Sequence, residues 1–305
     1  MNPNFPLYIV SKGRHESRLT AKALEKMGVP YYIVVEEQEY DLYMSVIKGG
    51  TVLVLDRKYL DNYDTFDKLG YKKSKGPGAA RNFAWDHSIS NGFSHHWVMD
   101  DNISEFLRLH NNMKLRVNDG AVFKAMEDFV LRYSNVCMAV PNYYMFAPRK
   151  AKIAPFITNT RIYSCNFIRN DIPFRWRGRY NEDTDLSLRI LKSGMCTIQF
   201  NVFLQLKAPT QTIKGGNTKE FYSNEGTLAK SKMQVKMHPD VSRLKFRFGR
   251  WHHFVDYRPF KINQLRLKDD IFIPEEPNNY GLKLNDMRVN ELQKRNTQSG
   301  SNKNS

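Results

Sequence analysis

The first sixty residues of the chain alternate between short apolar runs and segments with helical spacing. Apolar runs of strand length cover residues 7–10, 31–35 and 51–55. Between the first two runs, apolar side chains recur with helical spacing from Leu19 to Met27. This strand–helix–strand order predicts a parallel sheet covered by helices. The polar loops that follow such strands meet at one edge of the sheet, where we expect a nucleotide to bind.

A fourth apolar run ends abruptly in acidic and amide side chains. Residues 97–99 are apolar and are followed directly by Asp100, Asp101 and Asn102. Two adjacent carboxylates repel each other and lose hydration when buried, so they usually need a cation. Mg²⁺ or Mn²⁺ held by one or two acids and a substrate diphosphate fits this pattern, because hard ions prefer oxygen ligands. A solvated turn capped by Asp or Asn is the alternative interpretation.

A second group of acids lies far along the chain. Glu182, Asp183 and Asp185 open a helical segment whose apolar face includes Leu186 and Ile190. Carboxylates stabilise helix N-termini, so capping is one interpretation. Three acids exceed what a cap requires, and a carboxylate beside an acceptor can serve as a general base.

The chain is strongly basic. Its 305 residues carry a formal net charge of +16 and have an estimated pI of about 9.6. This balance favours a polyanionic partner, most simply nucleic acid, over a membrane surface or a merely solubilising role. Two segments combine cations with aromatic side chains. The residues in them that we expect to hold phosphates are Arg175, Arg177, Arg179, Arg247 and Arg250.

The remaining composition favours a cytoplasmic protein without a membrane partner. Cys137, Cys165 and Cys196 lie in apolar segments without metal-ligand spacing, as expected for reduced, buried thiols. The sequence has no secretory pattern at its start and no run of the ~18 apolar residues that a membrane span needs. Residues 291–305 are polar, and we expect them to be disordered.

The order of these motifs resembles that of GT-A glycosyltransferases, which use nucleotide-sugars, over roughly residues 7–238. The matching features are the loop of residues 11–14, the acids Glu36 and Glu37, the Gly-Ala-Ala-Arg-Asn segment at 78–82, and the acidic motifs at 100–102 and 182–185. Within that fold the sequence is similar to the phage TET-associated glycosyltransferases, which decorate hydroxymethylated pyrimidines in phage DNA.

The resemblance implies a fold and a domain organisation. The fold would be α/β of the Rossmann-like GT-A type, a mixed but mostly parallel sheet flanked by helices in a single large domain. Residues 1–240 would form the transferase domain, with a donor half at about 1–110 and an acceptor half at about 111–240. Residues 241–290 would be a basic C-terminal extension packed on that domain.

The resemblance also implies a donor site and a metal site. The residues around a UDP-sugar carrying arabinose or glucose would be Ser11, Arg14, Glu36, Arg81 and Asp100. Mn²⁺ or Mg²⁺ at Asp101 would act as a Lewis acid on the leaving diphosphate. The family's metal motif often reads Asp-any-Asp, whereas Asn102 stands at its third position here, so ligation by the Asn102 amide oxygen is the alternative. His238 is a further candidate ligand, and it is equally suited to contact phosphate or to lie at the surface.

The resemblance finally implies an inverting transfer to DNA. Asp183 would deprotonate the hydroxymethyl oxygen of 5-hydroxymethylcytosine, while Glu182 or Asp185 orients the acceptor. In double-stranded DNA this base has to be flipped out of the stack, at a cost of a few kcal/mol. We expect this to take place in the bacterial host cytoplasm during phage infection.

Three other function classes remain open. The chain could be a GT-A glycosyltransferase acting on a carbohydrate or a protein. It could be a nucleotidyltransferase on a related fold, although the N-terminal glycine-rich arginine loop of that chemistry is absent. A non-catalytic DNA-binding protein would explain the net charge but would leave the two acidic motifs without a role.

Overall fold

The computed structural model describes residues 1–67, 75–147, 153–208, 215, 226–272 and 276–277. The chain divides into a unit from Met1 to Leu267 and a C-terminal unit from Lys268 to Ser305. The first unit contains every predicted site residue. The tail at 291–305 lies outside the described residues. Within the described part, no helix is both long enough and apolar enough to cross a membrane.

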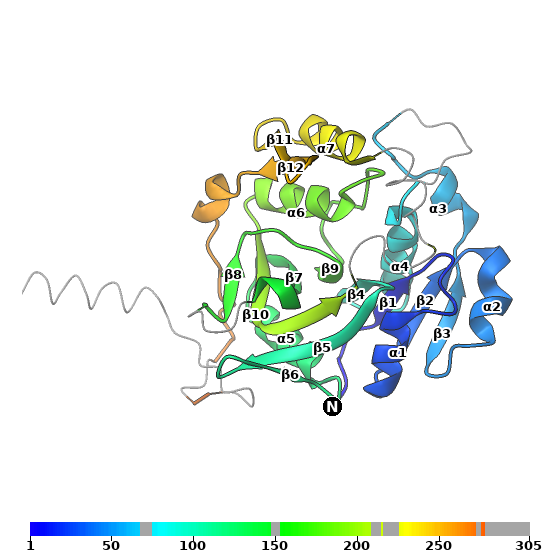
Figure 1. Ribbon diagram of the computed structural model, residues 1–305. Coiled ribbons are helices and arrows are strands. Elements are labelled where there is room, and N and C mark those ends of the chain that lie inside the picture. The colour runs from blue at the N-terminus through cyan, green and yellow to red at the C-terminus, as the bar shows by residue number, and fades with distance from the viewer. Residues whose placement is uncertain (68–74, 148–152, 209–214, 216–225, 273–275, 278–305) are drawn as a thin grey trace, which may run out of the picture. The chain divides into compact units, whose positions relative to one another are not determined.

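The N-terminal part of the sheet is parallel, as the sequence predicts (Figure 1). β1 (Leu7–Val10) lies between β2 (Tyr31–Val35) and β4 (His95–Asp100), and β3 (Gly50–Val54) pairs with β2. The helices in this part are α1 (Leu19–Lys26), α2 (Tyr40–Met44), α3 (Arg57–Asp61) and α4 (Gly78–Ser90), with a 3₁₀ turn, η1 (Glu37–Glu39), before α2. The register aligns Val10 with Asp100, so the chain leaves β1 and β4 at the same edge.

The second part of the chain extends the same sheet with mixed polarity. The order across the sheet is β3-β2-β1-β4-β9-β7-β10-β5-β6, and β8 pairs with β10 outside this order. β9 (Cys165–Arg169) runs antiparallel to both β4 and β7 (Val136–Tyr143), whereas β10 (Cys196–Lys207) is parallel to β7. The other elements are β5 (Ile103–His110), β6 (Met113–Arg116), α5 (Ala121–Val130), η2 (Tyr144–Phe146), β8 (Phe156–Thr158) and α6 (Glu182–Lys192). The fold is therefore the mixed α/β, GT-A-like architecture that the sequence predicts.

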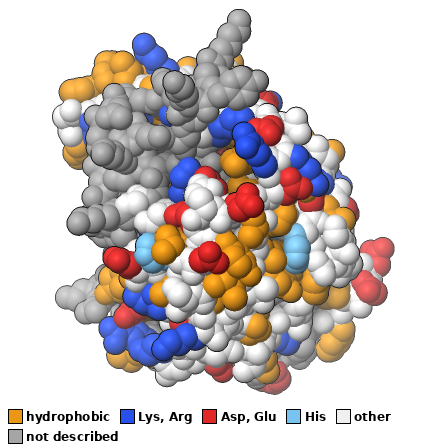
Figure 2. Space-filling model, turned by 90° about the vertical axis from the view of Figure 1, so that its right-hand side faces the viewer, with side chains coloured by type: hydrophobic (Ala, Val, Ile, Leu, Met, Phe, Trp, Pro, Cys, Tyr) orange, Lys and Arg blue, Asp and Glu red, His pale blue; other side chains and the backbone are white. Residues whose placement is uncertain are grey.

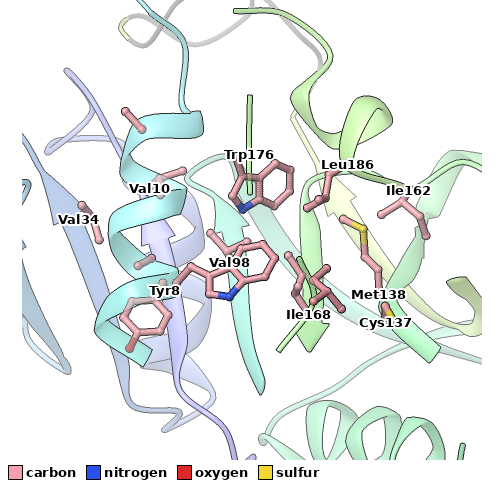
Figure 3. Close-up of a cluster of buried hydrophobic side chains, with 14 of the residues drawn as sticks. Tyr8, Val10, Val34, Val98, Cys137, Met138, Ile162, Ile168, Trp176 and Leu186 are labelled. Carbon is pink, nitrogen blue, oxygen red and sulfur yellow. The ribbon is translucent and has the colours of Figure 1, made fainter. Parts of the chain in front are cut away.

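Strand β4 is held between two cores because its successive side chains point to opposite faces of the sheet. Val98 belongs to the core beneath α4 and α6, together with Trp176 and Leu186 (Figure 3). Its neighbour Trp97 packs edge-on against Phe123 of α5, with ring centroids 5.2 Å apart. Both faces of β4 are thus fixed, so that the acidic motif at its carboxyl end starts from a rigid strand.

The C-terminal part of the first unit is helix α7 (Gly226–Met237) followed by an antiparallel hairpin of β11 (Ser242–Arg247) and β12 (Arg250–Val255). A 3₁₀ turn, η4 (Arg258–Ile262), follows. We call residues 242–255 the basic ribbon. Next to the ribbon, Val241 and Phe260 pack against Leu188 and Leu191 of α6, which anchors it to that helix. Figure 1 shows α7 and the two strands of the ribbon beside α6.

Candidate active site

Two cations from distant segments hold the carboxylate of Asp100. Arg81 Nη2 donates to Asp100 Oδ1 at 2.6 Å, and Lys207 Nζ donates to Oδ2 at 2.6 Å. Burial opposes the charge of this carboxylate, but Lys207 and Arg81 outweigh burial and hold the pKa of Asp100 well below its usual value. Asp100 is therefore ionised at neutral pH. Lys207, at the end of β10, was not among the residues predicted from the sequence.

Asp101 turns toward the loop after β1. Ser11 Oγ donates to Asp101 Oδ2 at 2.7 Å, and Arg14 forms an ion pair with Oδ1. The Tyr43 hydroxyl lies 2.6 Å from Ser11 Oγ and accepts the backbone N–H of Arg14 at 3.1 Å. Burial raises the pKa of Asp101, although Arg14 and Ser11 favour its charged form. The predicted donor residues Ser11 and Arg14 are thus brought together with Asp101.

Thr20 of α1 fixes the backbone of the same motif. Its hydroxyl donates to the Asp100 carbonyl at 2.6 Å and accepts the N–H of Ile103 at 2.9 Å, and its own N–H donates to the Asp101 carbonyl. Asn102 is buried, and its Oδ1 has no hydrogen-bond partner among the described residues. The backbone of the motif is therefore fixed as well as its two carboxylates, and the Asn102 Oδ1 atom is left without a partner among the described residues.

Glu36 lies just beyond the end of β2, next to the loop that follows β1. It accepts from Lys12 Nζ at 2.6 Å and from Gln38 Nε2 at 2.5 Å. The adjacent β1 loop is tied down by Glu39, which accepts the N–H of Gly13 at 2.6 Å. Glu36 is therefore on the sheet edge where the sequence predicts a nucleotide.

Arg81 is buried because the start of α4 is packed tightly. A side chain at Gly78 would overlap the Tyr63 hydroxyl, since a Cβ there would lie 1.9 Å from that oxygen. Gly76 has a φ of +84° and lies against the Arg179 carbonyl. These two glycines bring the first turn of α4 under residues 176–180, and the Arg81 guanidinium lies 4.6 Å from the Trp176 ring.

Arg81 also joins the two acidic motifs. Its Nη2 atom, which contacts Asp100, lies 3.5 Å from Oε1 of Glu182 at the start of α6. Burial raises the pKa of Glu182, against the effect of Arg81, and burial likewise raises the pKa of Asp183. Carboxylates with raised pKa values are stronger bases, which suits proton transfer near neutral pH. Acids far apart in the sequence therefore meet at one site.

Two stacked tyrosines, Tyr143 and Tyr163, lie within the electrostatic reach of Asp183. The rings of Tyr143 and Tyr163 are parallel, with centroids 5.8 Å apart. Burial and then the charge of Asp183 raise the pKa of Tyr163. The Tyr143 hydroxyl lies 2.6 Å from Ser164 Oγ, and this oxygen accepts from Lys207 at 2.7 Å. A chain of contacts thus leads from Lys207 to the surroundings of Asp183.

Asp185 and His238 bind each other in a buried cluster. The Asp185 carboxylate is fully buried and accepts from His238 Nε2 at 2.9 Å, Arg189 Nε at 2.8 Å and Arg177 Nη2 at 3.1 Å. These contacts tie α6 to the segment before it and to the end of α7. Asp185 is predicted to orient the acceptor and His238 to bind a metal, yet the arrangement favours an anchoring role for both. Neither has a hydrogen bond to Asp100 or Asp101 among the described contacts.

The arginines at positions 175, 177 and 179, which form the first predicted phosphate-binding segment, mainly contact other side chains of the protein. Arg179 is 2% exposed and donates to the Tyr180 hydroxyl at 3.0 Å. Arg177 is bound to Asp185, and the Arg175 guanidinium lies over the Trp85 ring at 4.7 Å. These arginines position the segment before α6, and the geometry does not favour phosphate binding by Arg179.

The second segment presents its cations on one face of the basic ribbon. Cross-strand pairing matches Arg243 with Phe254, Lys245 with His252 and Arg247 with Arg250. Alternation along a strand puts these side chains on the same face. Arg243 and Lys245 both lie over the Phe254 ring, at 4.8 and 4.2 Å, as a shared face requires. The opposite face carries Leu244, Phe246, Trp251 and His253, and α7 packs against β12.

Charges are distributed differently on the side of the molecule that carries α2, β3 and α3. Acidic and basic side chains are interspersed there around an exposed hydrophobic area (Figure 2). Leu42 and Met44 of α2 and Val54 of β3 are among the exposed apolar side chains. The basic ribbon differs from that side of the molecule because four positively charged side chains, those of Arg243, Lys245, Arg247 and Arg250, share one of its faces.

The residues present do not fit a divalent metal well. Among the described residues, no group of three or more His, Cys, Asp and Glu side chains is arranged to hold a metal ion. Both carboxylate oxygens of Asp100 and both of Asp101 already accept from Arg81, Lys207, Arg14 or Ser11. The Oδ1 atom of Asn102 is the spare acceptor of the motif. The predicted Mn²⁺ or Mg²⁺ site stays a prediction, and no step below is derived through a metal.

Acids thus gather beyond the carboxyl ends of the parallel strands, the edge at which open α/β sheets bind their ligands. The family model of the TET-associated glycosyltransferases matches residues 5–216, more than two thirds of the 305 residues. The chain therefore belongs to the TET-associated glycosyltransferase family, and its activity is that of a glycosyltransferase. No curated protein matches the chain. The match includes both acidic motifs and Lys207, and it ends before α7 and the basic ribbon.

Proposed function

We propose that this glycosyltransferase moves arabinose or glucose from a UDP-sugar to the hydroxyl of 5-hydroxymethylcytosine in double-stranded DNA. The observation that carries the proposal is the meeting of Asp100 and Glu182 at Arg81. It sets the donor side of the sheet, where Ser11 and Arg14 lie, next to the acids at the start of α6. Two substrates bound at these two places would have their reacting atoms close together.

Asp183 is the proposed general base. It takes the proton of the acceptor hydroxyl as that oxygen forms a bond to the anomeric carbon of the sugar. The bond from this carbon to the diphosphate oxygen breaks, and its electron pair leaves with UDP. Attack opposite to the leaving group inverts the anomeric configuration. The raised pKa of Asp183 supports this role, since a more basic carboxylate is a better proton acceptor.

The acceptor side favours a nucleobase. The parallel rings of Tyr143 and Tyr163 beside Asp183 provide the flat aromatic surface on which a base taken out of a duplex can stack. The basic face of the ribbon, including the predicted contacts Arg247 and Arg250, supplies cations for the phosphates. Phage DNA with modified bases is met in the cytoplasm of an infected bacterial host, where we place the reaction.

Two alternatives make different predictions. A carbohydrate or protein acceptor would leave the basic ribbon without a function in transfer. A non-catalytic DNA-binding protein would bind duplex DNA without consuming a UDP-sugar. Mass spectrometry of DNA containing 5-hydroxymethylcytosine, incubated with the protein and UDP-glucose or UDP-arabinose in the presence and absence of Mn²⁺, separates the three possibilities.

The role of Asp183 can be tested in the same assay. We expect Asp183→Asn to lower transfer by at least about a hundredfold, the usual contribution of a general base. Asp128→Asn is the matched control, because Asp128 is an exposed acid of α5 that pairs with Lys124. Near-normal transfer by Asp183→Asn, with a normal melting temperature, would show that another group takes the proton.

A further inference from the structure

Arg81 and Lys207, the two cations that contact Asp100, both have N–H donors that make no hydrogen bond within the described part of the chain. Both Nε and Nη1 of Arg81 are buried and have no partner among the described residues. An ammonium group has three N–H donors, and Lys207 uses two of them, on Asp100 at 2.6 Å and on Ser164 at 2.7 Å. Buried donors without a partner cost free energy, so an arrangement of this kind favours a ligand that brings acceptor oxygens.

A divalent cation needs the opposite chemistry. It binds oxygen lone pairs at about 2.1 Å, and the Asp100 oxygens already contact Lys207 and Arg81 at 2.6 Å. A metal on the same oxygen as Lys207 would place two cations within a few ångströms of each other. Their repulsion is strong in a buried site, because the protein interior screens charge poorly.

Lys207 keeps its charge in this environment. Burial opposes its protonation, but Asp100 and Tyr143 raise the pKa of Lys207 above its ordinary value. Its side chain is about one-fifth exposed, whereas that of Arg81 is almost completely buried. Lys207 is therefore the more accessible of the two cations, and Arg81 lies behind it, stacked on Trp176.

We propose that Lys207, oriented by Asp100 and Ser164, binds the diphosphate of the sugar donor in place of a divalent metal ion. Its charge stabilises the negative charge that accumulates on the diphosphate as the bond to the anomeric carbon breaks. Asp100 is then a positioning residue for Lys207 and Arg81. The inference rests on the proposed use of a UDP-sugar, and it replaces the predicted metal with a side chain of this chain.

Calorimetric titration with UDP tests the inference without relying on turnover. We expect the full-length protein to bind UDP with the same dissociation constant, within about twofold, in EDTA and in Mn²⁺. Lys207→Met should weaken binding roughly 10- to 150-fold, the effect of removing one charged hydrogen bond. Lys114→Met is the control, because Lys114 is a part-buried lysine of β6 that donates to the Tyr144 carbonyl.

A double variant distinguishes binding from structural support. Lys207→Met alone removes a partner of Asp100 and is expected to lower the melting temperature. Asp100→Asn combined with Lys207→Met removes both charges of this pair and leaves Arg81 with Glu182 as its acidic partner, and we expect the affinity for UDP to stay as low as in Lys207→Met. Recovery of wild-type affinity in the double variant would overturn the inference, since Lys207 would then act only on Asp100.

The remaining outcomes separate this inference from the proposed function. If wild-type protein binds UDP only with Mn²⁺, the donor class stands and the metal-free site is wrong. If it binds UDP in neither condition, both the proposed donor and this inference fail. Mn²⁺ electron paramagnetic resonance gives an independent readout. The spectrum of Mn²⁺ without UDP should be unchanged by the protein, and a new protein-bound signal would contradict the inference.

Discussion

Neutralising one face of the basic ribbon gives the sharpest test of DNA as the acceptor. Arg243, Lys245, Arg247 and Arg250 share that face, and all four are replaced by Gln in a quadruple variant. None of the four belongs to the cluster that anchors the hairpin to α6, and three of them are exposed, with Lys245 half-buried. The substitution should therefore leave the fold and the donor site intact.

The size of the effect follows from counterion release. Each phosphate neutralised on duplex DNA contributes about 0.9 to the slope of log affinity against log salt, so four contacts contribute about 3.6. Between 50 and 200 mM salt, a slope of 3.6 corresponds to about 150-fold in affinity. We expect the quadruple variant to bind duplex DNA weakly at low salt. The slope of its log affinity against log salt should be smaller than that of the wild type by about 3.6.

The assay is fluorescence anisotropy with a labelled duplex across a salt series. The matched control replaces Lys26, Lys48, Arg57 and Lys58, which are exposed cations around α1, α2 and α3. Either quadruple variant lowers the formal net charge from +16 to +12, so long-range attraction changes equally. Equal salt slopes for the two variants would refute the assignment of phosphate contacts to the ribbon.

Two further predictions concern groups outside the donor site. Burial raises the pKa of Glu127 from 4.5 to about 7 and outweighs the hydrogen bonds that its carboxylate accepts from Trp97 and from the N–H groups of Asn4 and Phe5, which lower the pKa. The folded state therefore binds this proton more tightly than the unfolded state, and stability should fall by up to about 3 kcal/mol as pH rises from 4.5 to 7. Urea titrations should show this loss in wild type and not in Glu127→Gln; equal pH dependence would contradict the assignment. At the ribbon tip, Phe248 is 91% exposed with a φ of +54°, followed by Gly249 at +71°. Because Asn-Gly suits such a turn better, Phe248→Asn should raise the melting temperature slightly. If the Phe248 ring stacks on a base, the same substitution should weaken DNA binding by about 1–3 kcal/mol. Unchanged DNA binding would exclude stacking.

The parallel part of the fold was predictable from local patterns, whereas the meeting of the two acidic motifs was implied by the family resemblance. Apolar runs of strand length alternate with helical spacing, and parallel strands necessarily bring their polar ends to one edge. That rule alone predicts that Asp100 lies at the same edge of the sheet as Ser11 and Arg14. The rule also predicts that Arg81, at the start of the helix before β4, lies near the same edge. In the structure the contact between Arg81 and Asp100 places Arg81 at that edge.

Lys207 was missed because nothing local marks it. It is 107 residues from Asp100 in the sequence and ends a strand that joins the sheet beyond β9 and β7. Only the strand order decides that this lysine, and not another of the many in the chain, reaches Asp100. The ribbon could have been recognised from the sequence, since residues 243–247 alternate between basic and apolar side chains, as expected for a β-strand.

Helix α6 connects the two functions that are proposed for this chain. Glu182 and Asp183 stand at its first turn, while Leu188 and Leu191 near its other end pack against Val241 and Phe260, which flank the ribbon. An α-helix rises 1.5 Å per residue, so the eleven residues of α6 span about 16 Å. The helix is also held internally, because the buried Asp185 cluster locks its first turn to the end of α7. A duplex bound on the ribbon would therefore be set at a fixed distance from Asp183, with no flexible segment between the anchored base of the ribbon and the acid. Under the proposed function, such a rigid connection would select acceptors by the reach of one flipped nucleotide. Sugar transfer would then depend on residues inside the family match, and the choice of acceptor would depend on a hairpin outside it.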